Sequence, residues 1–350
     1  MSELTHRARK ILFSVVTEFI ATGDPVGSRT LARKYGLDLS AASVRNVLAD
    51  LEEAGFLKQP HTSAGRIPTD RALRLFIDTL MEVRSVSPQE QARIGERFAE
   101  IYAVADDPLR ATGKLLSELS GAAGVVAPPR SEMRALAQLR FIPTKPKQLL
   151  AVLVFADGTV ENRFIQVEEG VPESELTRVH NLLADVIEGR TLGEVRDLFA
   201  RRMADEQVLV DALRRRAFEL GSRAIEDVSR RTSVENLVIE GHTRLMDLPE
   251  YGDSERMKKL MRALEEREEL VALLDKTLCA GAVTVFIGSE AGELGTAGDL
   301  SLVVAPYTER GRVAGTVGVL GPTRMDYSKV MPLVDATATA MSEALNKPSK

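Results

Sequence analysis

Three polar side chains near residue 45 have the types and spacing that read the edges of DNA bases. Ser43, Arg45 and Asn46 fall on the outward side of a helix that we expect to begin after Ser40. An arginine can donate two hydrogen bonds to guanine, an asparagine can pair in bidentate fashion with adenine, and a serine hydroxyl serves a base or a phosphate. We therefore predict that this helix enters the major groove of double-stranded DNA.

Two neighbouring segments supply further cations and hydroxyls for the DNA backbone. Ser28 and Arg29 stand at the start of a preceding short helix, whose N-terminus suits a phosphate. Lys58, His61 and Arg66 lie on a hairpin that we expect to reach the backbone or the minor groove. A helix-turn-helix that never touches DNA can carry the same residues as solvated charges, so that interpretation stays open here.

The elements that position these side chains follow from apolar spacing and from helix breakers. The expected elements are helices from His6 to Thr22, from Ser28 to Gly36 and from Ser40 to Gly55, with wing strands from Phe56 to Pro60 and from Gly65 to Pro68. Ser28 and Ser40 are the predicted N-caps. Val44, Leu48 and Leu51 recur at helical spacing and predict the buried stripe of the third helix.

The rest of the chain alternates helical and β-rich runs. Predicted helices are Asp70–Val83, Gln89–Gly121, Glu173–Ile187, Thr191–Ala204, Gln207–Ser229, Ser254–Leu278 and Ser328–Leu345. Predicted strands are Ala122–Pro128, Ala135–Pro143, Gln148–Phe155, Val160–Val167, Val234–Glu240, Ala282–Ile287, Leu300–Ala305 and Arg312–Leu320. Asp157-Gly158 is a hairpin signal, so three antiparallel strands are expected before residue 168. The pattern indicates a multidomain α+β fold.

Composition bounds the class of protein. The chain has 350 residues, of which 44% are hydrophobic and 28% charged, as in folded proteins with two or three domains. The net charge of −5 by itself argues against DNA binding, but a modestly basic N-terminal part precedes an acidic remainder. No apolar run reaches the length of a membrane span, and the N-terminus has no apolar core. A cytoplasmic protein without a membrane partner is expected.

The residues give little support to an enzyme. Cys279 is the single cysteine, which excludes internal disulfides and a cysteine-based zinc site, and the four histidines are scattered. The glycine-rich run from Gly288 to Gly298 lacks the lysine and hydroxyl of a nucleotide loop, so a flexible surface hairpin is expected. No nucleophile, base and orienting group can be assembled from spacing. We expect no catalytic residue, no cofactor and no metal.

Two other polar features are expected to be ordinary surface. His180 falls in a helix with no partner that its own sequence neighbours reveal, and we expect it to be solvated. For the run Arg214-Arg215-Arg216 the alternatives are an anion site and a charged helix face, and the charged helix face is the preferred interpretation.

Four stretches together resemble the family of HrcA-type heat-inducible transcription repressors over nearly the whole chain. They are Asp24–Leu31, Ser40–Val47, Pro60–Thr69 and Gly321–Tyr327. The chain departs from the family pattern at Ala72-Leu73, where a Gly-Tyr pair is expected. The junction after the wing is therefore expected to pack differently.

The resemblance implies three domains. They are a winged helix-turn-helix at 1–84, a GAF-like domain at 89–130 and 233–347, and an inserted dimerising domain at 131–232 with a three-stranded antiparallel sheet and helices. It implies a homodimer that represses heat-shock chaperone operons at an inverted-repeat operator and depends on the GroEL-type chaperonin. The DNA contacts that it implies are Ser43, Arg45, Asn46, His61, Thr62, Ser63 and Arg66.

Two competing functions remain at this point. One is a repressor that responds to a small molecule bound in the GAF-like domain, although a fold does not by itself define a function. The other is an adaptor that binds the chaperonin and has no DNA activity.

Overall fold

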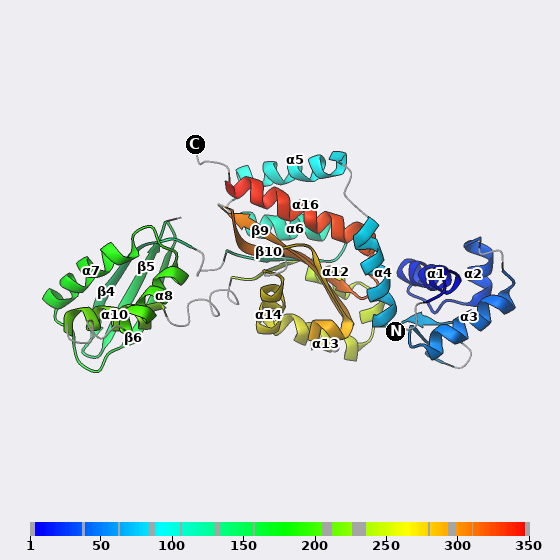
Figure 1. Ribbon diagram of the computed structural model, residues 1–350, viewed down its shortest axis with the longest axis horizontal. Helices are drawn as coiled ribbons and strands as arrows, with labels where there is room; N and C mark the ends of the chain where they lie inside the picture. The colour runs from blue at the N-terminus through cyan, green and yellow to red at the C-terminus, as the bar shows by residue number, and fades with distance from the viewer. Residues whose placement is uncertain are drawn as a thin grey trace. The chain divides into compact units, whose positions relative to one another are not determined.

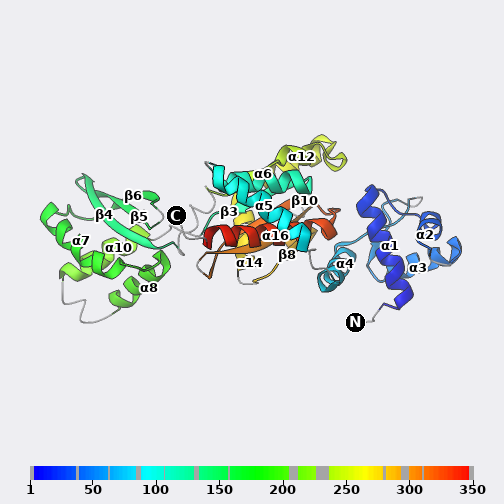
Figure 2. The same ribbon diagram turned by 90° about the horizontal axis from the view of Figure 1, so that it is seen from above.

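The computed structural model describes residues 4–36, 39–61, 64–83, 88–105, 107–129, 134–156, 158–204, 212–225, 236–278, 281–292, 299–309 and 311–346. Contacts divide the chain into two compact units (Figures 1 and 2). One unit joins Met1–Ala127 to Leu237–Lys350, and the other is Pro128–Asn236. Helices and antiparallel sheets occur in both, so the predicted multidomain α+β class is confirmed.

The first unit begins with a small helical core. Its elements are α1 (His6–Thr22), α2 (Ser28–Lys34), α3 (Ala41–Glu53), β1 (Leu57–Lys58), β2 (Ile67–Pro68) and α4 (Asp70–Val83). The fully buried apolar side chains come from the predicted helical stripes and include Ile11, Leu12, Val15, Val16, Leu31 and Val44. The N-cap prediction for Ser28 was wrong, because Gly27 holds that position and Ser28 is the first helical residue.

The same unit continues with a five-stranded antiparallel sheet in the order β7-β3-β10-β9-β8. Its strands are β3 (Ala123–Ala127), β7 (Val238–Glu240), β8 (Thr284–Ile287), β9 (Leu300–Glu309) and β10 (Arg312–Pro322). Its helices are α5 (Pro88–Val104), α6 (Pro108–Ser120), α12 (His242–Met246), η2 (Pro249–Tyr251), α13 (Ser254–Glu265), α14 (Arg267–Leu278), η3 (Gly288–Ala291) and α16 (Tyr327–Asn346). Helices α6 and α16 lie on one face of the sheet, and α14 packs on the other (Figure 1).

Two helices that we predicted as continuous are interrupted in the structure. The predicted helix over 89–121 is α5 and α6, because Pro108 begins a new helix and Asp107 caps it by accepting the backbone N–H of Arg110 at 3.1 Å. The predicted helix over 254–278 is α13 and α14. Glu266 leaves the helical region there, with ψ at 61°.

The second unit packs helices on one face of a three-stranded sheet (Figure 2). Its elements are β4 (Leu136–Lys145), β5 (Gln148–Phe155), β6 (Val160–Gln166), α7 (Glu173–Ile187), α8 (Leu192–Met203) and α10 (Ala212–Ile225). The predicted antiparallel order is confirmed. Leu153, Phe155, Val179, Phe199 and Ala217 belong to the buried cluster between the sheet and the helices. Asp157 of the predicted hairpin and Cys279 lie outside the described residues.

The prediction of a solvated His180 was wrong. The backbone N–H of Phe141 on β4 donates to Nε2 of His180 at 2.8 Å, and the two rings stack at 5.9 Å between centroids. Burial lowers the pKa of His180, and the nearby Arg140 charge acts in the same direction. The imidazole therefore accepts as a neutral ring and joins α7 to the sheet.

Among the described residues, no helix is both long and apolar enough to cross a membrane.

Candidate nucleic-acid interface

Helix α3 is held by its buried stripe and by a capped N-terminus. Val44 is fully buried, and Leu48 and Leu51 are each only 1% exposed. The Ser40 hydroxyl accepts the backbone N–H of Ser43 at 3.1 Å, as an N-cap does. Both features were predicted and both are confirmed. They fix which side of α3 turns away from the core.

The outward side of α3 carries the side chains expected to read bases. Ala42, Arg45 and Asn46 are exposed, and Ser43 is half-buried. The Ser43 hydroxyl lies 3.0 Å from the Ser40 hydroxyl, so part of its hydrogen-bonding capacity is used inside the cap. Arg45 and Asn46 thus lie next to each other on an exposed polar surface, while Ser43 lies at its margin.

A buried carboxylate ties α2 to α1. Glu18 on α1 is 7% exposed and accepts from Lys34 Nζ at 2.6 Å and from the Tyr35 hydroxyl at 2.7 Å. These hydrogen bonds, first that of Lys34 and then that of Tyr35, lower the pKa of Glu18 against the effect of burial. Burial and the bond to Glu18 raise the pKa of Tyr35 to about 12. The sequence analysis missed this cluster, because its members are far apart in the chain.

The start of α2 and the wing hairpin present several of the other predicted contacts. Arg29 is exposed and Ser28 is half-buried. Lys58 and His61 are exposed on the hairpin, where the Gln59 amide donates to the carbonyl of Ala64 at 2.9 Å. Thr62 and Ser63, also predicted contacts, lie outside the described residues.

Arg66 has a partner within the chain. Its Nη2 and Nε lie 2.8 and 3.0 Å from one carboxylate oxygen of Glu52 on α3, and its side chain is 18% exposed. Its backbone pairs with that of Val26 in both directions, at 2.8 and 2.9 Å. Next to it, a Cβ on Gly65 would lie 2.6 Å from the carbonyl oxygen of Pro25, so only glycine allows this approach. Arg66 therefore braces the hairpin of β1 and β2 against α3, a role that sequence reasoning did not foresee.

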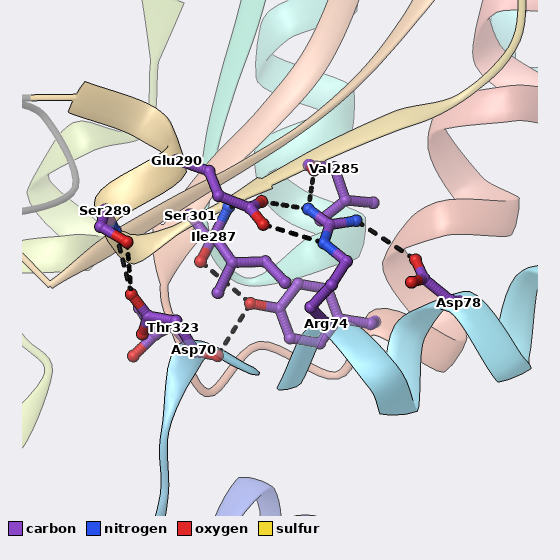
Figure 3. A network of polar contacts seen from close by, with 10 residues as sticks. Asp70, Arg74, Asp78, Val285, Ile287, Ser289, Glu290, Ser301 and Thr323 are labelled. Carbon is purple, nitrogen blue, oxygen red and sulfur yellow. Dashed lines mark hydrogen bonds and ion pairs between the residues drawn. The ribbon is translucent and has the colours of Figure 1, made fainter. Parts of the chain in front are cut away.

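Helix α4 contacts the turn that follows β8 (Figure 3). Asp70 accepts the backbone N–H and the hydroxyl of Ser289, both at 3.0 Å. Arg74 donates from Nε to Glu290 at 3.0 Å and from Nη2 to Glu290 and to the carbonyl of Val285. The predicted surface hairpin thus begins, where the structure describes it, as a 3₁₀ turn bound to α4, which corrects the expectation for Gly288–Ala291.

Ala72 and Leu73, where the chain departs from the family pattern, lie on the inner side of α4. They are 0% and 2% exposed, and Ile77 on the same helix is also fully buried. Phe76 meets Phe13 of α1 edge to face, with ring centroids 5.3 Å apart. Helix α4 is therefore packed against α1 while its polar residues bind the turn after β8.

Comparison with known proteins shows to which family the chain is similar. The family described as HrcA protein C terminal domain matches residues 106–331. The heat-inducible transcription repressor HrcA of Sorangium cellulosum (strain So ce56) is 76% identical over 349 residues, which cover 99% of each chain. The protein of the same name from Geobacter sulfurreducens is 40% identical over 345 residues, again with 99% of each chain covered. A crystal structure of a hypothetical protein at 2.2 Å resolution matches 98% of this chain and 99% of its own, with a TM-score of 0.58 and 22% identity, which shows the fold.

These similarities define the class as transcription repressors built on a multidomain α+β fold. The chain belongs to the HrcA family of heat-inducible transcription repressors.

Proposed function

We propose that this chain represses heat-shock chaperone operons by binding an inverted-repeat operator as a homodimer. The observation that carries the proposal is the exposed pair Arg45 and Asn46 on α3, a helix whose opposite side is buried. We assign residues 1–84 as a winged helix-turn-helix. In such a domain the second helix of the motif lies in the major groove, and its N-terminal residues reach base edges.

The proposed DNA contacts fall into two classes, those to base edges and those to the sugar-phosphate backbone. Arg45 and Asn46 read base edges, and each good bidentate contact discriminates against a wrong base by about 1–3 kcal/mol. Ser43 serves a base or a phosphate. Ser28, Arg29, Lys58 and His61, with Thr62 and Ser63, bind the sugar-phosphate backbone and position the helix without specifying sequence.

Arg66 contributes in a different way from the prediction. Because its guanidinium is paired with Glu52, we propose that it supports the wing against α3 and so sets the wing's approach to DNA. A direct phosphate contact by Arg66 would require the side chain to leave that carboxylate.

The proposed homodimer forms through the unit that contains the three-stranded sheet, which we assign as the inserted domain at 131–232. The division of the chain at Ala127 and Leu237 supports an insertion there. The open face of its sheet exposes three large apolar side chains, Ile142, Val160 and Phe164, at 49%, 55% and 65%. Apolar clusters of this kind mark protein interfaces. A two-fold dimer then presents two copies of α3 to two half-sites.

We assign residues 89–130 and 233–347, which flank the inserted domain in the sequence, as the GAF-like domain.

The response to heat is proposed to depend on the GroEL-type chaperonin. Family membership supports this part. A loss of about 1–2 kcal/mol of folding stability can change the active population several-fold, so a repressor that needs assistance to fold loses activity when the chaperonin is occupied by other clients.

The test is direct binding to a duplex that carries the inverted repeat of a chaperonin promoter. Preference over a scrambled duplex of equal length, retained in competition with non-specific DNA, supports a repressor, whereas equal affinity for both duplexes overturns the proposal. In a second arm the protein is refolded with and without chaperonin and titrated with the same duplex. Equal active fractions would remove the chaperonin from the mechanism while leaving operator binding intact.

A further inference from the structure

The start of α4 and the residue before it bind two different parts of the molecule. Toward α3, Thr69 donates its hydroxyl to the carbonyl of Gly55 at 2.9 Å, and Arg71 donates to the carbonyl of Ala54 at 2.8 Å. The Arg71 guanidinium also lies 4.3 Å from the ring centroid of Phe56. These contacts join the end of α3 to the start of α4.

Asp70 and Arg74 face the turn after β8 instead (Figure 3). Asp70 and Arg74 are four residues apart and therefore share one side of the helix. Their partners Ser289 and Glu290 are adjacent in η3, so two oppositely charged side chains hold two neighbouring residues. Such a pair fixes both the position and the rotation of the helix on the turn.

The close approach depends on a glycine. Gly288 has φ of +46°, and a Cβ at this position would lie 2.5 Å from a carboxylate oxygen of Asp70. On the other side of the turn, Glu290 accepts the backbone N–H of Ile287 at 3.1 Å, which orients the carboxylate toward Arg74. Gly288 therefore allows Asp70 to approach the turn, and Glu290 is oriented to bind Arg74.

From these contacts we propose that Asp70 and Arg74 are positioning residues that fix the orientation of α3 on the five-stranded sheet, and that the fixed orientation sets the half-site spacing which the dimer accepts. The inference rests on the proposed function. Two rigidly held reading helices can both enter the groove only when the half-sites lie on the matching side of the duplex. Loosely held helices would tolerate other spacings.

The experiment measures the affinity of the full-length protein for inverted repeats whose half-sites are moved apart by 0, 2 and 5 base pairs, and for a single half-site. We expect the wild-type protein to lose about tenfold or more at half a helical turn of displacement. In Arg74→Gln and Glu290→Gln this loss should shrink to about threefold or less, with single half-site affinity unchanged.

Matched variants distinguish the loss of the contacts between α4 and η3 from a general loss of charge. Asp78→Asn removes only the contact of Arg74 within α4, at 3.5 Å, and should keep the wild-type spacing dependence. The doubly reversed Arg74→Glu, Glu290→Arg protein should recover part of the dependence that each single reversal loses, because the ion pair returns while the bonds to the Val285 carbonyl and from the Ile287 N–H do not. A readout without DNA is amide hydrogen exchange of Ser289, which should accelerate in Asp70→Asn.

The outcomes distinguish the two proposals. If the wild-type protein binds no inverted repeat, the proposed function is wrong. If it binds every spacing equally, or if the Arg74 and Glu290 variants are as selective for spacing as the wild-type protein, operator binding stands and the positioning role is overturned.

Discussion

Two exposed surfaces in this molecule each lie opposite a buried side of the same helix or sheet, but they differ in chemistry. On α3, a buried stripe of Val44, Leu48 and Leu51 leaves Arg45 and Asn46 on the outside. On the three-stranded sheet, one face packs against α7, α8 and α10 and the other exposes Ile142, Val160 and Phe164. In both cases one side of an element is buried in the core and the other side is exposed.

The difference indicates how each surface is used. Exposed apolar area costs about 25 cal/mol per Å² in water, so the sheet face is expected to be covered for the life of the protein. A polar helix face is stable in water and can bind and release a charged partner, with an affinity that depends on salt. Under the proposed function, the permanent contact and the reversible contact would belong to separate units of the chain.

The largest effect is expected from placing a charge on the apolar surface. Phe164→Asp should weaken the dimer by about 100-fold or more, because a carboxylate would be buried against a second apolar face. Sedimentation velocity measures the change, and operator affinity should fall with it. Thr177→Asp, at an exposed position on α7, is the control and should stay dimeric. A dimeric Phe164→Asp protein would show that subunits associate elsewhere.

The next effect concerns the polar surface. Arg45→Ala should reduce the preference for the operator over a scrambled duplex by about 10- to 100-fold, which corresponds to the loss of one bidentate base contact. Competition binding measures the ratio, and sedimentation should show an unchanged dimer. Arg97→Ala, which removes an exposed cation on α5, is the matched control. An unaltered ratio in Arg45→Ala would remove this side chain from base recognition.

A smaller effect is expected from the buried carboxylate of Glu18. Glu18→Gln should lower the free energy of unfolding by about 1–3 kcal/mol at neutral pH, since the bonds from Lys34 and Tyr35 lose their charged acceptor. The pKa of Glu18 is lowered in the folded state, so its contribution is present above the pKa of a free glutamate and disappears as the pH falls through the folded value. Urea unfolding at several pH values measures the difference.

Tyr35→Phe serves as the control for that series, because it removes one hydroxyl and keeps the Lys34 bond. It should cost less than Glu18→Gln. A stability difference between wild type and Glu18→Gln that persists unchanged in acid would contradict the electrostatic explanation.

Patterns within one element predicted much of the fold. The helices Asp70–Val83 and Glu173–Ile187 and the strand Gln148–Phe155 have the expected bounds, because periodicity and their flanking turn residues are local signals. Ser40 was identified as a cap for the same reason. The break at Pro108 was available in the sequence and was overlooked, although proline favours a first helical position.

Contacts between residues far apart in the chain could not be predicted from local sequence patterns. The bond from the Phe141 amide to His180 spans two elements, and so does the pairing of Arg66 with Glu52. One sequence shows that a side chain can donate or accept, but the packing of the elements decides which partner it meets. For the same reason the candidate base-reading side chains could be named while the network of Asp70 and Arg74 could not.

The bond from Arg74 to the carbonyl of Val285 has a consequence for solubility. Strand β8 is the last strand of its sheet, and the backbone groups along such an edge can pair with strands of other molecules. By occupying one of these carbonyls, Arg74 of α4 removes an acceptor that a foreign strand would need. A fragment that lacks the first 83 residues should therefore self-associate at concentrations where the full chain does not, and sedimentation that shows equal behaviour of the two would refute this protective role.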